Sequence, residues 1–80
     1  MEIKMAQGNV NVICELIEEI NGEAKSPKGD LVSVKITTAK SNSAWFARIE
    51  GAGQSRVFKF ATELQMNEMV ASQTRFFVKG

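Results

Sequence analysis

The sequence predicts a small α+β domain in which an antiparallel sheet of three to four strands packs against two helices. Two patterns predict this class. Apolar and polar residues alternate with the period of a strand in several stretches after residue 30, and apolar residues recur with the period of a helix over residues 10–20. Eighty residues with 44% hydrophobic content suffice for one core and not for two, so we expect residues 1–80 to form a single domain.

The first part of the chain is predicted to hold a short edge strand and an acidic amphipathic helix. Residues 2–5 form the strand, which Gly8 and Asn9 end. The helix has about three turns and ends at Asn21-Gly22. Its apolar stripe consists of Val10, Ile13, Cys14, Ile17 and Ile20, and its acidic residues are Glu15, Glu18, Glu19 and Glu23. We interpret Cys14, the one cysteine, as a small core residue.

The rest of the chain is predicted to alternate strands with short turns before a second helix. The helix begins at Thr62, because Gln65 follows at the spacing of a capping box. Glycines at 51 and 53 allow a tight hairpin turn. The other expected elements, in order, are a loop over 25–30, strands over 32–37, 44–50 and 56–60, and a final strand over 74–79.

Three of these strands interleave cations with aromatic or branched apolar residues, which predicts a basic and partly aromatic open face. We expect that face to gather Lys35, Phe46, Arg48, Val57, Lys59, Arg75, Phe77 and Lys79. Trp45 then points to the core, or becomes the exposed aromatic residue if the register is inverted. Such a face can contact phosphates and stack bases, although the same alternation is typical of an ordinary solvated sheet face.

Charge divides the chain into an acidic start and a basic remainder. Residues 1–24 hold one cation against five acids, and residues 25–80 hold nine cations against four acids, within a net charge of +1. This asymmetry fits a negatively charged partner, and it also fits two solvated faces of opposite sign.

Catalytic constellations are nearly absent from the sequence. The chain has no histidine and no tyrosine, and no group of residues has metal-ligand spacing, so we expect neither an enzyme nor a metal or other cofactor. No apolar run is long enough to span a bilayer and no secretory signal is visible, so we expect a cytoplasmic protein without a membrane partner. A fold of this size has little stability in reserve, which favours self-association as a homodimer.

A stretch of the second half resembles AP2-like DNA-binding domains and the arm-binding domains of some phage integrases. The resemblance rests on residues 45–49, the glycine turn, residues 56–60 and the helix opening at 62–63, and it covers roughly residues 31–72. In that family a three-stranded sheet lies in the major groove of DNA. The resemblance implies DNA contacts by Trp45, Arg48, Arg56 and Lys59.

Two functional hypotheses follow, and both describe a binding protein. In the first, the sheet binds DNA, or else RNA, through Lys35, Trp45, Phe46, Arg48, Arg56, Lys59, Arg75 and Phe77. In the second, the protein is an accessory or inhibitor of phage or mobile-element type that binds a host protein complex. Its acidic helix then mimics nucleic-acid charge with Glu15, Glu18, Glu19 and Glu23.

Overall fold

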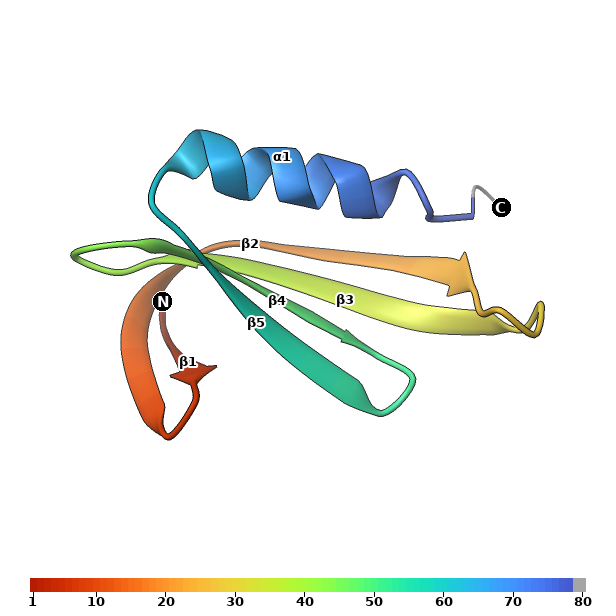
Figure 1. Ribbon diagram of the computed structural model, residues 1–80, viewed down its shortest axis with the longest axis horizontal. Helices are drawn as coiled ribbons and strands as arrows, with labels where there is room; N and C mark the ends of the chain where they lie inside the picture. Colours follow the sequence, from red (N-terminus) through yellow and green to blue (C-terminus); the bar gives the residue numbers. More distant parts are fainter. Residues whose placement is uncertain (79–80) are drawn as a thin grey trace.

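The computed structural model describes residues 1–78, which form one five-stranded antiparallel sheet and one helix (Figure 1). Neighbouring strands follow the order of the chain, from β1 to β5. The sheet curls until β1 approaches β5, so that it forms a nearly closed barrel. The elements are β1 (Glu2–Gln7), β2 (Val10–Lys25), β3 (Leu31–Lys40), β4 (Trp45–Gly51), β5 (Gln54–Phe60) and α1 (Glu63–Thr74).

This architecture corrects the predicted fold class, because residues 10–20 form a strand and not a helix. β2 is 16 residues long and pairs with β1 through its first part and with β3 through its second. A bulge between Leu16 and Glu18 shifts the alternation by one position. Even-numbered apolar residues of β2 therefore point to one face of the sheet before the bulge and to the other face after it. Because the bulge interrupts the period of two, the apolar residues over 10–20 recur at a spacing like that of a helix.

The two faces of the sheet carry two separate clusters of buried residues. On the face that we call the hairpin face, the β1–β2 hairpin curls over a cluster of Met5, Cys14, Ala39, Ala44 and Phe46. The opposite face, which we call the helix face, carries Ile36 and Ala47 in the β3–β4 register, both with 0% exposure. Helix α1 contacts β4 and β5 on this face, and its residue Met66 is buried.

The helix start confirms the predicted cap, and the β4–β5 connection confirms the predicted hairpin. Thr62 Oγ1 accepts a hydrogen bond from the Gln65 amide at 3.2 Å. The β4–β5 turn places Ala52 and Gly53 at φ of 53° and 74°, the left-handed conformation that two-residue hairpin turns require.

The predicted final strand over 74–79 is wrong within the described residues. The helix continues to Thr74, and only Phe77 makes an isolated antiparallel bridge, to Ala24 of β2. The backbone N–H of Val78 donates to the Glu23 carbonyl at 2.6 Å. Lys79 lies outside the described residues. Over residues 1–78, no helix is long and apolar enough to cross a membrane.

Candidate binding groove

The strand register divides the residues that were predicted to bind DNA between the two faces of the sheet. Lys35, Phe46, Arg48 and Lys59 do share a face, the hairpin face. Arg56 points to the helix face, where its β4 partner is Ile49. The remaining predicted residues lie on the helix side of the sheet: Trp45 in β4, Arg75 at the end of α1, and Phe77 packed on Gly22.

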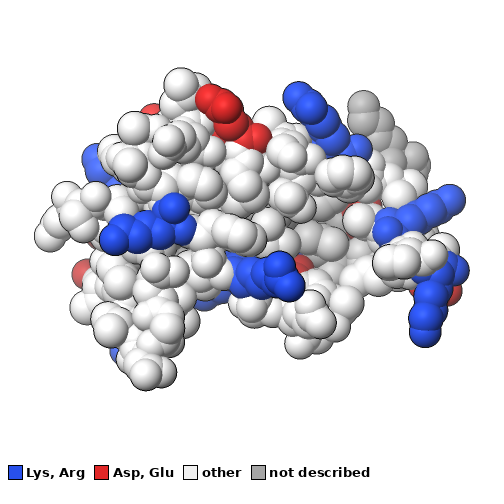
Figure 2. All heavy atoms as spheres, in the orientation of Figure 1, with Lys and Arg blue, Asp and Glu red and all other residues white. Residues whose placement is uncertain are grey.

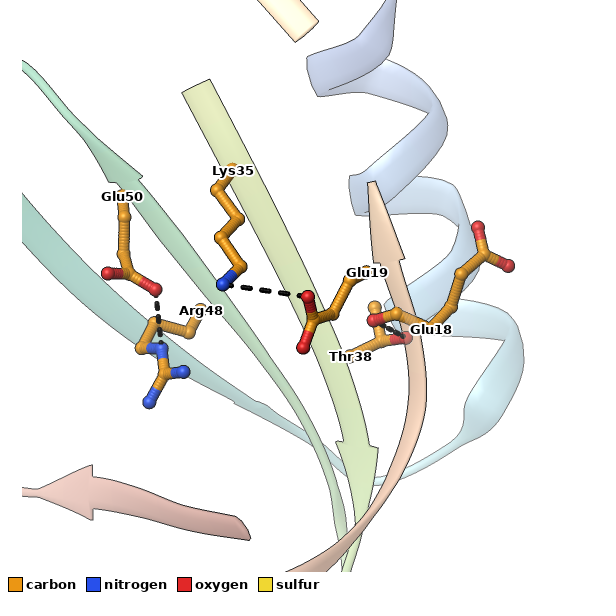
Figure 3. A network of polar contacts seen from close by, with 6 residues as sticks. All are labelled: Glu18, Glu19, Lys35, Thr38, Arg48 and Glu50. Carbon is orange, nitrogen blue, oxygen red and sulfur yellow. Dashed lines mark hydrogen bonds and ion pairs between the residues drawn. The ribbon is translucent and has the colours of Figure 1, made fainter. Parts of the chain in front are cut away.

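Acidic partners neutralise two of the cations on the hairpin face. Lys35 Nζ lies 3.5 Å from Glu19 Oε2, and Arg48 Nε donates to Glu50 Oε1 at 2.9 Å (Figure 3). Arg48 Nη1 also donates to the backbone carbonyl of Lys4 in β1 at 3.3 Å. On the side of the molecule in Figure 2, uncharged surface separates the basic side chains, which form no continuous stripe. Lys35 and Arg48 are therefore engaged within the protein.

Phe46 is a core residue, so the expectation of an exposed aromatic side chain at this position is wrong. Its exposed fraction is 2%, and it packs with Met5 and Cys14 under the β1–β2 hairpin. The hairpin was not foreseen, because the residues that form its second strand had been assigned to a helix. Phe46 cannot stack a base without the opening of this core.

Trp45 lies at the end of the helix face where the sheet meets the start of α1. It pairs with Phe60 of β5 and Lys40 of β3, and Lys40 Nζ lies 5.1 Å from the centroid of its ring. No described residue accepts a hydrogen bond from its buried Nε1. Trp45 therefore packs locally, away from the residues that form the groove described below.

The four glutamates of the acidic hypothesis lie on β2, so the proposed acidic helix face does not exist. Their side chains alternate between the two sides of the strand, and Figure 3 shows Glu18 and Glu19 pointing in opposite directions. Glu19 and Glu23 lie on the hairpin face, and Glu15 and Glu18 on the helix face. Glu15 Oε2 forms an ion pair with the N-terminal ammonium group at 3.2 Å.

A groove of about 400 Å³ lies on the helix face, between the C-terminal end of α1 and strands β3 to β5. Its floor is apolar and includes Val32, Val34 and Ile49. Phe58, Phe76, Phe77 and Arg56 surround this floor, and Lys25, the last residue of β2, also lines the groove. None of the described residues that line the groove is acidic.

Local sequence explains how these side chains reach the groove. Arg56 and Phe58 are two positions apart on β5, so they point to the same face. Phe76 and Phe77 follow the last turn of α1, and the Phe77 ring packs over Gly22, which has no side chain to obstruct it. Phe76 remains 69% exposed and Phe58 37% exposed.

A second hollow, of about 550 Å³, lies at the same end of the sheet and has a different character. Its lining mixes polar and apolar surface and contains two carboxylates, Glu23 and Glu50, beside Lys35. An anionic ligand meets repulsion there, which favours the aromatic groove as the site for one.

The groove offers side chains suited to binding. No cluster of three His, Cys, Asp or Glu residues occurs among residues 1–78. Cys14 is buried on the other side of the sheet, and its burial raises the pKa of the thiol, which keeps it protonated. The rings and cations of the groove can stack on planar groups and contact anions.

Lys25, Phe58 and Phe76 line the groove and were not among the residues predicted to bind a partner. Phe58 and Phe76 were assigned to buried strand faces, and Lys25 to a surface loop. The run Arg75-Phe76-Phe77 directly after a helix was the available signal, since three consecutive residues of this kind cannot all be buried in a single strand.

Comparison with family models, curated proteins and solved structures finds no match to this chain. The chain does contain three consecutive strands followed by a helix, the order on which the resemblance to AP2-like domains rests. The four residues implied to contact DNA are divided between two faces, Trp45 and Arg56 on one, Arg48 and Lys59 on the other. The resemblance therefore stays a prediction.

Proposed function

We propose that the protein binds single-stranded nucleic acid in the aromatic groove. In this proposal bases stack on Phe58 and Phe76, and phosphates contact Lys25 and Arg56. The observation that carries the proposal is the lining of the groove, in which partly exposed phenylalanines occur together with cations and no described residue is acidic. Stacking rings beside a basic path are the common design of proteins that bind single strands.

A single strand fits this groove better than a duplex does. Phenylalanine can stack only on a base whose face is accessible, and base pairing with stacking hides that face in a double helix. A duplex would instead require an extended basic surface, whereas Lys35 and Arg48 are paired with Glu19 and Glu50.

The number of cations at the groove sets the expected salt dependence. Lys25 and Arg56 line it, and the exposed Arg75 adjoins Phe76. Three phosphate contacts give a slope of about −2 in a plot of log affinity against log salt for a single strand. Affinity should then fall about twentyfold between roughly 50 and 200 mM salt.

The test is fluorescence anisotropy of labelled oligothymidine and of a duplex at these two salt concentrations. Arg56→Ala should reduce the salt slope by about 0.7, because one phosphate contact is lost. Lys59→Ala is the matched control, since Lys59 is an exposed cation of the same strand on the opposite face. An equal reduction of the slope by both substitutions would remove the groove from the proposal.

A second pair of variants tests stacking. Phe76→Ala should weaken binding by about 5- to 100-fold, the range found for loss of one stacked base. Leu64→Ala is its control, because Leu64 is a 68% exposed apolar residue of α1 that lies outside the groove. Preference for the duplex, or no loss in Phe76→Ala, would contradict binding of a single strand at this site.

A further inference from the structure

The outer edge of β2 is open along its middle. β1 pairs with β2 only as far as Glu15, and the Leu16 amide donates to the Met1 carbonyl at 2.8 Å. At the other end, Phe77 bridges Ala24. Between Leu16 and Glu23, no described residue pairs with this edge.

Backbone alternation identifies the groups that point out of the open edge. The Glu23 carbonyl points outward, since it accepts the hydrogen bond from Val78 at 2.6 Å. N–H and C=O groups of an antiparallel strand point to the same side at every second residue. The backbone groups of Glu19 and Asn21 therefore also point outward, where they can pair with another strand.

The side chains beside this edge are acidic and exposed. Glu19 and Glu23 flank Asn21 on the hairpin face, and Glu18 lies next to Ile20 on the helix face. Glu19 is held only by its ion pair with Lys35, in which both side chains are more than 40% exposed. An exposed pair of this kind is weak, so an incoming cation can replace Lys35.

The charges also indicate which strand the edge accepts. A second copy of β2, paired antiparallel about Asn21, would place Glu19 opposite Glu23, and like charges at directly opposed positions are unfavourable. A strand with cations at alternate positions would place them beside these two carboxylates.

We propose that the β2 edge binds an extended basic segment of a partner protein as an added strand. Alternate lysines or arginines of that segment contact Glu19 and Glu23, and its backbone pairs with Glu19 and Asn21. Main-chain hydrogen bonds supply affinity in this mode of recognition, and the side chains that flank the edge supply selectivity. The Val78 hydrogen bond supports the proposal, because it shows the same edge accepting a backbone N–H from a segment that bridges it in antiparallel direction. This proposal does not require that the groove binds nucleic acid.

A short fluorescein-labelled peptide of alternating lysine and valine is the probe, and its anisotropy is followed during titration with the protein. The double variant Glu19→Lys/Glu23→Lys should lower the affinity about tenfold or more, because two cross-strand charge pairs become repulsive. Glu63→Lys/Glu68→Lys is the matched control. It makes the same change of net charge at exposed positions of α1. It should lower the affinity for the peptide much less than the edge variant does.

Two further measurements separate strand addition from simple charge attraction. Asn21→Pro removes an outward N–H, a substitution that strand edges tolerate, and should abolish saturable binding while the circular dichroism spectrum is retained. In the wild-type protein, the peptide should slow hydrogen exchange of the Glu19 and Asn21 amides. Unchanged exchange at both amides, or equal binding of a peptide with N-methylated alternate amides, would overturn the proposal.

Discussion

Replacement of Gly22 by alanine provides the sharpest test of how the C-terminal segment is attached. Gly22 lies in β2 with an ordinary negative φ, and a Cβ atom at this position would lie 2.7 Å from Cγ of Phe77. The Phe77 ring must therefore leave its place when alanine is introduced. In a strand without this neighbour, the same substitution is stabilising, because alanine loses less backbone entropy on folding than glycine does.

These opposing effects set the expected magnitudes. Loss of the packing of a half-buried phenylalanine costs about 1–1.5 kcal/mol, half of the value for complete burial. Alanine in place of glycine contributes about 0.5–1 kcal/mol in the other direction. Gly22→Ala should therefore destabilise the protein by about 0.5 kcal/mol, and it should stabilise a Phe77→Ala background by about 0.5–1 kcal/mol.

A double-mutant cycle followed by urea denaturation measures the difference. The coupling energy between Gly22→Ala and Phe77→Ala should be about 1–1.5 kcal/mol, well above the deviation from additivity that independent sites show. Equal effects of Gly22→Ala in both backgrounds would refute the contact. The groove would then lack the wall that Phe77 is assigned to form.

Three further expectations concern the two cores and the helix start. Phe46→Ala should destabilise by about 3–5 kcal/mol in urea denaturation, whereas Lys59→Ala, its exposed register partner, should change stability by less than about 0.5 kcal/mol. Thr62→Ala should lower the free energy of unfolding by about 1 kcal/mol in the same assay, because the helix cap is lost. Ser72→Ala, at an exposed position of the same helix, should not lower it. Burial raises the pKa of the Cys14 thiol above its ordinary value, so the unfolded chain loses this proton first. Stability should therefore be unaffected by this group below pH about 9 and fall above it, and the urea midpoint of a Cys14→Ala variant should lack this dependence.

Local signals in the sequence were sufficient to predict the strands and turns in the second half of the sheet. The glycines of the β4–β5 turn and the cap at Thr62 depend on neighbours within a few residues, and both were predicted correctly. Alternation along β3, β4 and β5 also placed Lys35, Arg48 and Lys59 on one face, as the register has it. What alternation could not tell was which face the helix covers and what covers the other.

The prediction for the first half of the chain was wrong because a single bulge interrupts the alternation of apolar and polar residues along β2. Before the bulge between Leu16 and Glu18, Cys14 points into the hairpin core; beyond it, Ile20 points to the helix face. A pattern search that assumes one uninterrupted period reads such a strand as a helix. The burial of Phe46 was hidden by the same error, since its cover is the hairpin that contains β2.

The segment 77–78 joins the two proposed sites. The Phe77 ring forms part of the groove on the helix face, and the Val78 N–H occupies the Glu23 carbonyl at the end of the open edge. An added strand that pairs only with Glu19 and Asn21 leaves this hydrogen bond intact. A longer strand that reaches Glu23 must displace Val78, which releases Phe77 from Gly22 and removes one wall of the groove. Because linkage is reciprocal, a strand of that length and an oligonucleotide should each weaken the binding of the other, whereas the shorter strand should leave the groove unaffected.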